Sequence, residues 1–267
     1  MSADPFESFK AKQKLGWAHF APLETFTTLV AAHLVEYARV RAGQRVLDVA
    51  CGTGVAAVTA ARLGARVSGL DLTPALLERA VENAEIAGVQ IEWREGDAEA
   101  MPFEDGVFDV VLSQFGHIFA PRPEIALAEM LRVLKPGGTI AFATWPPELF
   151  MGRQFQLAAR YSPPLTPGAS PSTLWGDPQV VTQRLGSAVR EIVFDRGTMR
   201  APALSPQHAR LRIERSAGPF VNIIESLAAT DPVKLAALRR EHEALIAEYL
   251  ADNAVRQDYL LTRAVKI

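Results

Sequence analysis

The chain of 267 residues has a single cysteine, Cys51. One thiol cannot form an internal disulfide, and it gives none of the cysteine spacings that bind zinc. The sequence therefore gives no indication of a disulfide-stabilised secreted domain, and we expect no metal centre. Cys51 lies inside a tight turn where a small apolar thiol packs well, so we interpret it as structural.

Long apolar runs and an excess of charge of one sign are also missing. No segment approaches the ~20 apolar residues of a membrane span, and the polar start MSADPFESFK lacks the apolar stretch of a signal peptide. The 28 Lys and Arg residues are scattered and nearly balance 30 Asp and Glu residues, so no basic patch favours nucleic acid or anionic lipid. We expect a cytoplasmic protein with no membrane span and no nucleic-acid partner.

What the chain does have is an alternation of strand-like and helix-like segments. Apolar runs in RVLDVA, RVSGLDL, IEWREGD, FDVVLSQF and TIAFATW are separated by helical patterns such as VAAVTAARLG, TPALLERAVENAEIAG and PEIALAEMLRVLKPGG. This alternation predicts βαβ units around a parallel sheet. A helical pattern, LETFTTLVAAHLVEYARV, precedes the first strand.

The pattern loosens after Trp145. A proline-rich stretch, YSPPLTPGASPSTLWGD, cannot form a central strand or a long helix, and we expect a loop there. A short helix, PQVVTQRLG, and a strand, VREIVFDRGTM, follow it. Three helical patterns then precede DYLLTRAVKI, whose alternation predicts a closing strand.

The turn DVACGTG raises the question of what it binds. Gly52, Gly54 and Ala57 fit the G-x-G-x-x-G/A fingerprint of dinucleotide sites, which favours an NAD(P)-dependent oxidoreductase. Asp48 stands beside this turn, where its carboxylate would repel a pyrophosphate. It would attract an ammonium group such as that of a methionine moiety, while the turn's amides suit a carboxylate or ribose.

Two further carboxylates follow the next two strands. Asp71 ends the second strand, where it can accept both hydroxyls of a ribose, a feature that NAD and adenosyl ligands share. Asp97 follows the third strand and can accept the exocyclic amine of adenine, while the Ala98 amide donates to a ring nitrogen. These positions indicate a ligand that contains adenosine.

Five segments in order carry a family resemblance. VLDVACGTG, GLDLTPALLERA, EGDAEAMPF, FDVVLSQF and EMLRVLKPGG resemble the motifs of class I S-adenosylmethionine (SAM) dependent methyltransferases, in particular the branch similar to ubiquinone/menaquinone C-methyltransferases. The resemblance covers about residues 45–145. It implies an α/β, Rossmann-like fold with a seven-stranded, mostly parallel sheet, an antiparallel last strand and helices on both faces.

The resemblance also implies a cofactor site. Carried onto this chain, the family pattern puts Asp48 and the backbone of Ala50, Gly52 and Gly54 around the methionyl part of SAM, Asp71 on the ribose, Leu72 against adenine, Asp97 and Ala98 at the adenine edge, and Ser113 beside the methionyl end. S-adenosylhomocysteine would be the product. A non-catalytic SAM-binding protein remains a further interpretation beside the methyltransferase and the oxidoreductase.

The boundaries of the organisation follow from the same patterns. We expect an N-terminal helical cap over residues 1–40 and a SAM-binding α/β core over 41–204. A helical lid insertion over 205–253 would precede the last sheet strand, 254–267. The fourth strand ends in SQFG and lacks the Asn/Asp-Pro-Pro-aromatic signature of enzymes that methylate amino groups of nucleic acids, so we expect a small-molecule acceptor under the lid.

One histidine is a candidate for catalysis. Methyl transfer to carbon or to a hydroxyl needs a proton removed, and a histidine can accept it near neutral pH. His117 lies two residues past the SQF end of the fourth strand and is the predicted base, with packing under the lid as the alternative role. Trp17, His19 and Phe20 either cover the cofactor or fix the first helix to the core.

Overall fold

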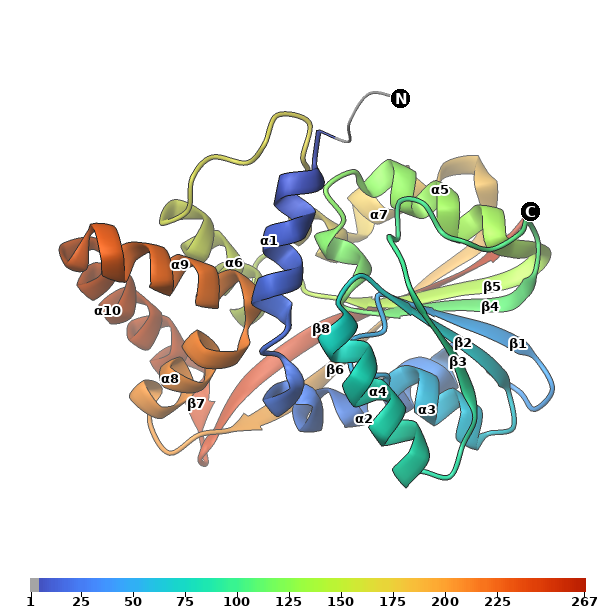
Figure 1. The fold of residues 1–267 in the computed structure, drawn as a ribbon, viewed down its shortest axis with the longest axis horizontal. Coiled ribbons are helices and arrows are strands. Elements are labelled where there is room, and N and C mark those ends of the chain that lie inside the picture. The colour runs from blue at the N-terminus through green and yellow to red at the C-terminus, as the bar shows by residue number, and fades with distance from the viewer. Residues whose placement is uncertain (1–4) are drawn as a thin grey trace.

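The computed structural model describes residues 5–267, and a twisted sheet runs through it (Figure 1). Its strands follow the order β3-β2-β1-β4-β5-β8-β6, and a short strand, β7 (Leu250–Ala251), pairs with β8. The bounds are β1 (Arg45–Val49), β2 (Arg66–Asp71), β3 (Ile91–Glu95), β4 (Phe108–Gln114), β5 (Leu134–Thr144), β6 (Val189–Pro202) and β8 (Ala254–Lys266). Neighbours from β3 to β5 are parallel, and β8 is antiparallel to β5 and β6. This confirms the predicted Rossmann-like sheet with its antiparallel last strand.

Helices cover both faces of the sheet. One face carries α2 (Glu24–Tyr37), α3 (Val55–Arg62) and α4 (Pro74–Ile86), and the other carries α5 (Pro123–Val133) and α7 (Pro178–Leu185) (Figure 1). Central strands are apolar on both sides, so Leu47, Leu112 and Phe142 have no exposed surface. Strands buried on both faces read as continuous apolar runs, which is why the sequence reveals them well.

A second helical layer lies beside the carboxyl ends of the strands, at the left of Figure 1. It consists of α8 (Pro206–Ser216), α9 (Gly218–Thr230) and α10 (Pro232–Tyr249), inserted between β6 and β8, together with α6 (Phe150–Arg160). These helices share an apolar core of their own that includes Phe150, Phe220 and Ile246. The sequence does not predict α6, because Gly152 and the prolines on either side of this 11-residue segment obscure its period.

The N-terminal helix α1 (Glu7–Trp17) stands between the sheet and this helical layer (Figure 1). It contacts α9 closely, since a Cβ on Gly16 would lie 2.8 Å from the Gly218 carbonyl oxygen. Four short 3-10 turns complete the chain: η1 (Ala21–Leu23), η2 (His117–Phe119), η3 (Ser172–Gly176) and η4 (Gly186–Ala188). Residues 162–171 form the predicted proline-rich loop, and the Ser170 amide donates to the Pro121 carbonyl.

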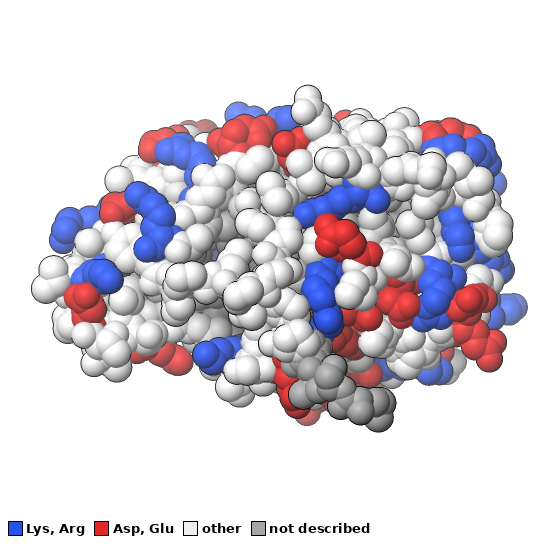
Figure 2. Space-filling model, turned by 90° about the horizontal axis from the view of Figure 1, so that it is seen from above, with Lys and Arg blue, Asp and Glu red and all other residues white. Residues whose placement is uncertain are grey.

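Residues 5–267 show neither a membrane-spanning helix nor a metal centre. None of their helices combines the length and the apolar character that a membrane crossing requires. No group of three or more His, Cys, Asp or Glu side chains in this range is arranged to hold a metal ion. On the face seen in Figure 2, basic and acidic side chains lie side by side around a broad uncharged area, so this face presents no extended patch of one sign.

Candidate active site

A cavity of about 210 Å³ lies at the carboxyl ends of β1, β2 and β4, under α1. Its walls include Phe9, Lys10, Gln13, Trp17, Phe20, Ala50, Cys51, Gly52, Thr53, Asp71, Leu72, Leu76, Gly96, Asp97, Ala98, Gln114, Phe115, Gly116, His117, Phe119, Trp145, Met151, Gln154, Phe155 and Ala217. Ligands of open α/β sheets bind at this edge, where the strand order reverses beside β1. Seven of the ten predicted site residues line the cavity: Ala50, Gly52, Asp71, Leu72, Asp97, Ala98 and His117.

The glycine turn after β1 forms the floor of the cavity. Ala50, Gly52 and Gly54 all have positive φ, of 52°, 54° and 76°, so the chain reverses tightly before α3. A Cβ at Gly52 would meet only the Leu76 Cδ1 atom, 4.0 Å away, which leaves the cavity side of the turn open. Gly54 faces the protein instead, where a Cβ would lie 2.6 Å from Trp93. Gly54 is therefore a structural part of the turn and does not line the cavity.

The Asp71 carboxylate stands at the end of β2 and shapes the turn. Its Oδ2 accepts the Gly52 amide at 2.8 Å, and its Oδ1 accepts the Thr73 amide at 2.8 Å. Burial raises the pKa of Asp71 although these amides favour the ionised form. A carboxylate oxygen can accept more than one hydrogen bond, so both oxygens retain capacity toward the cavity.

Asp97 is joined to the N-terminal helix. Its Oδ2 lies 2.6 Å from the Lys10 Nζ, and its Oδ1 accepts the Glu99 amide at 2.9 Å. Lys10 also donates to the buried Glu99 at 2.7 Å, and Arg122 binds the same carboxylate. The sequence does not indicate a role for Lys10, because its contact with Glu99 joins two residues 89 positions apart.

Asp48 and Ser113 lie behind the wall and not on it. Asp48 is 1% exposed, its Oδ2 accepts the Ala57 amide at 2.9 Å, and its Oδ1 has no hydrogen-bond partner among residues 5–267. Burial raises its pKa to about 7. The Ser113 hydroxyl donates to the Val49 carbonyl at 2.7 Å and accepts the His117 amide at 3.1 Å. These two side chains hold strand ends and turns in place.

His117 starts η2 on the cavity wall, but its ring is buried. Neither ring nitrogen has a hydrogen-bond partner in the described chain, and the ring packs against Phe142 and Trp175, with centroids 4.8 and 4.7 Å away. Burial, with a smaller effect of the Arg184 charge, lowers the pKa of His117 to about 3. The imidazole is therefore neutral at physiological pH.

Aromatic side chains close the other half of the cavity. Phe115 stacks on Trp145 with ring centroids 3.8 Å apart, and Trp17 packs on Phe119 at 4.7 Å. Trp17 and Phe20 line the cavity, whereas His19 is exposed and not among the lining residues. The aromatic N-terminal cluster thus both covers the cavity and anchors α1.

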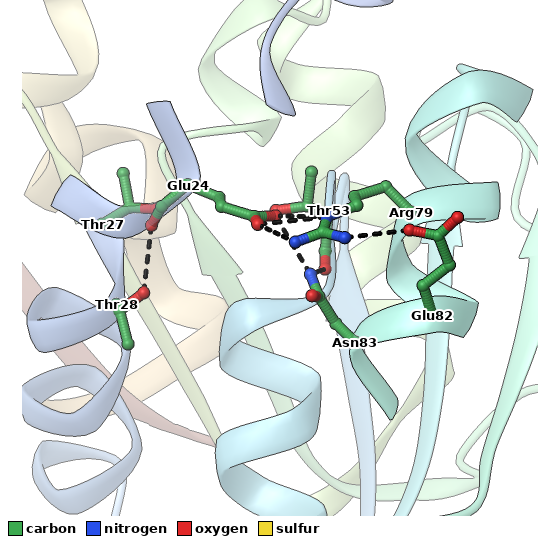
Figure 3. Close-up of polar contacts among 7 residues, drawn as sticks. All are labelled: Glu24, Thr27, Thr28, Thr53, Arg79, Glu82 and Asn83. Carbon is green, nitrogen blue, oxygen red and sulfur yellow. Dashed lines mark hydrogen bonds and ion pairs between the residues drawn. The ribbon is translucent and has the colours of Figure 1, made fainter. Parts of the chain in front are cut away.

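A polar cluster behind the glycine turn fixes it to two helices (Figure 3). Asn83 of α4 donates to the Thr53 carbonyl and to Glu24, both at 3.0 Å. Arg79 of α4 forms an ion pair with Glu24 of α2 at 2.6 Å. Burial alone would raise the pKa of Glu24, but the bonds from Arg79 and Asn83 outweigh it and lower the pKa.

Comparison with known proteins agrees with this geometry. A family profile described as a methyltransferase domain matches residues 46–138, which span β1 to β5. The demethylmenaquinone methyltransferase of Thermus thermophilus is 41% identical over 115 residues, 42% of this chain and 52% of that protein. The chain belongs to the SAM-dependent methyltransferases. Uncharacterized protein Rv1403c of Mycobacterium tuberculosis is similar over more of this methyltransferase, with 38% identity across 87% of the chain and 85% of that protein.

Solved structures share the fold of this methyltransferase at low identity. YcgJ of Bacillus subtilis has a TM-score of 0.56 at 20% identity, over 88% of this chain and 97% of that one. A phosphoethanolamine N-methyltransferase of Haemonchus contortus, solved with S-adenosylhomocysteine, has a TM-score of 0.54 at 19% identity, over 90% of this chain and 52% of that one. The [4+2]-cyclase SpnF is similar too, with a TM-score of 0.55 at 20% identity, 90% coverage of this chain and 80% of that one. Such likeness shows a common fold, and the identity of the methyl acceptor has to be inferred from the residues of the site.

The residues of the cavity fit SAM. The turn at Gly52 leaves space in which a ligand can approach the backbone closely, and the carboxylates of Asp71 and Asp97 line the same cavity as possible acceptors for a diol and an amine. Leu72 and Leu76 add apolar surface to the cavity wall. This donor set matches a ribose, an adenine and an amino-acid end better than it matches a pyrophosphate.

Proposed function

We propose that the protein transfers the methyl group of SAM to a small, largely apolar acceptor that occupies the aromatic half of the cavity. The observation that carries this proposal is the distribution of charge. Among the lining residues the charged side chains are Lys10, Asp71 and Asp97, all on the side of the glycine turn and the ends of β2 and β3. Burying a charged acceptor against uncharged aromatic walls would cost free energy.

In the proposed complex each part of the site has a separate task. SAM supplies a methyl group on a positively charged sulfonium, whose charge disappears on transfer. Asp71 accepts the ribose hydroxyls, Asp97 and the Ala98 amide bind the adenine edge, and the backbone of Ala50 and Gly52 surrounds the methionyl end. Gly54 and Ser113 act through the backbone that they hold, and Asp48, buried behind the turn, acts through its charge on the ammonium group of the methionyl end. The aromatic walls align the acceptor and exclude water, which is the main requirement of an in-line displacement.

Cofactor binding gives the most direct test of this proposal. We expect S-adenosylhomocysteine, at about a hundred times its dissociation constant, to raise the melting temperature by about 5–10 °C. NAD and NADH should leave it unchanged, because the buried Asp48 disfavours a pyrophosphate beside the turn. Thermal melts over a concentration series measure both, and a shift with NAD but none with S-adenosylhomocysteine would refute the proposal.

Asp48 predicts a proton linked to cofactor binding. With a pKa of about 7 this carboxyl is about half protonated at neutral pH, and a nearby ammonium group favours the ionised form. Binding of S-adenosylhomocysteine should then release up to about half a proton at pH 7, and its affinity should rise as the pH rises through 7. Calorimetry in two buffers of different ionisation enthalpy measures the release.

Two controls isolate Asp48 as the source of this proton. Asp48→Asn should abolish the release, and 5′-methylthioadenosine, which lacks the amino-acid end, should bind the wild type without it. Equal heats in both buffers for S-adenosylhomocysteine on the wild type would show that the ammonium group does not lie near Asp48.

A further inference from the structure

A buried amide side chain, that of Gln154, stands among the apolar walls of the acceptor half. Gln154 belongs to α6, lines the cavity beside Met151 and Phe155, and is only 1% exposed. A buried amide needs hydrogen-bond partners for both its oxygen and its nitrogen, because an unpaired polar group in a dry site costs free energy. The partners of Gln154 therefore reveal which end of the amide a ligand would meet.

The oxygen of this amide is bound inside the helical layer. Gln154 Oε1 lies 3.0 Å from Nε2 of His242 on α10, a helix that packs beside α6 (Figure 1). His242 is 1% exposed and stacks on Phe220 with centroids 4.7 Å apart, so its ring is held in place. Burial lowers the pKa of His242 to about 4, which makes the ring neutral, and the contact then requires the hydrogen on Nε2.

The nitrogen of the amide has only a weak acceptor opposite it. Gln154 Nε2 donates to the Met151 thioether sulfur at 3.8 Å, and thioethers accept hydrogen bonds weakly. An amide nitrogen carries two hydrogens, so a donor remains for a molecule in the cavity. With the His242 hydrogen on Nε2, the amide cannot reverse without losing that bond.

The geometry points to Gln154 as the residue that selects the acceptor, by donating a hydrogen bond to a carbonyl or ether-like oxygen of an uncharged molecule, with His242 as the positioning residue. This inference rests on the proposed function, because it concerns the acceptor half of the same cavity. A ligand that places only hydrogen-bond donors next to Gln154 Nε2 would bind poorly, because two donors cannot form a hydrogen bond with each other. The site would therefore favour aromatic carbonyl compounds over hydrocarbons of equal shape.

The test compares two probes in protein saturated with S-adenosylhomocysteine. Acetophenone and α-methylstyrene have nearly the same shape and differ in a C=O against a C=CH₂ group. The dissociation constant of α-methylstyrene divided by that of acetophenone, measured by ligand-observed NMR, should fall about fivefold in Gln154→Met, the usual effect of one hydrogen bond. His242→Phe should lower the ratio as well, because the freed amide can turn its oxygen to the cavity.

A matched control comes from the same wall. Gln114 also lines the cavity, but its Nε2 donates to the strong Thr27 carbonyl acceptor at 2.9 Å, and its unpartnered atom in the described chain is the acceptor Oε1, so Gln114→Leu should leave the ratio unchanged. The ¹⁵N shifts of His242 at pH 7 should report a hydrogen on Nε2. A hydrogen on Nδ1, an unchanged ratio in Gln154→Met, or no binding of either probe would overturn the inference. Failure of S-adenosylhomocysteine to bind would instead refute the proposed function.

Discussion

Replacing Asp71 with alanine should weaken the binding of S-adenosylhomocysteine between ten- and a hundredfold. Hydrogen bonds to a charged acceptor contribute about 2 kcal/mol, and the variant loses those from the ribose. The structure adds a second effect, since Asp71 also accepts the amides of Gly52 and Thr73. We therefore expect a lower melting temperature as well as a larger dissociation constant, both measurable on the same sample.

A ligand series separates the contact with the ribose from the distortion of the turn. Removing the ribose 2′-hydroxyl from S-adenosylhomocysteine should weaken its binding to the wild type and have almost no further effect on Asp71→Ala. Asp109 provides the matched variant. It also accepts a backbone amide, that of Arg45, but it lies at the start of β4, whereas the cavity lies at the carboxyl ends of the strands. If Asp71→Ala and Asp109→Ala bind the ligand equally well, the ribose lies elsewhere.

Replacing His117 is expected to slow the chemical step by about 10²-fold or more while SAM affinity is retained, if this histidine is the base. It is the one histidine on the cavity wall within residues 5–267. Since its pKa is about 3, the imidazole is already neutral above pH 5, and the single-turnover rate should not vary between pH 5 and 9 through His117. The rate should fall only as the pH approaches 3, where the ring takes up a proton.

Two variants distinguish a base from a packing residue. His117→Phe preserves a ring between Phe142 and Trp175, whereas His117→Asn leaves part of that space empty. A base role predicts a slow single turnover in both variants. A packing role predicts a full rate per folded molecule in His117→Phe and a stability loss in His117→Asn, and this result would remove His117 from the mechanism. Rapid-quench assays with a verified acceptor give the rates, and thermal melts give the stabilities.

The same buried ring affects stability in acid. In the unfolded chain a histidine takes up a proton near pH 6.5, whereas His117 and His242 resist it down to about pH 3 and 4. The unfolded state therefore binds more protons in this range, and the free energy of unfolding should decrease as the pH falls below 6.5. Urea unfolding at pH 7 and pH 5 measures this, and His117→Phe should reduce the difference.

The sequence alone determined the sheet and the position of the glycine turn. Strands buried on both faces appear as uninterrupted apolar runs, and positive φ angles favour glycine at Gly52 and Gly54, so both features are local and visible. The sequence could predict that Asp71, Asp97 and Ala98 lie on one cavity wall, because parallel strands bring their carboxyl ends to one edge. The order β3-β2-β1-β4 places the carboxyl ends of these strands side by side, so the residues that follow them line one cavity.

The tertiary structure decided everything that depends on contacts distant in sequence. Helix α1 has few apolar positions, and it is held by the ion pair of Lys10 with Asp97 and by its packing on α9. Asp48 was expected at the ligand, but the turn directs its carboxylate to the Ala57 amide. The bond between Gln154 and His242 joins two residues that lie 88 positions apart in the sequence, on different helices. No local pattern encodes such pairs, because they form only when the helical layer packs against the sheet.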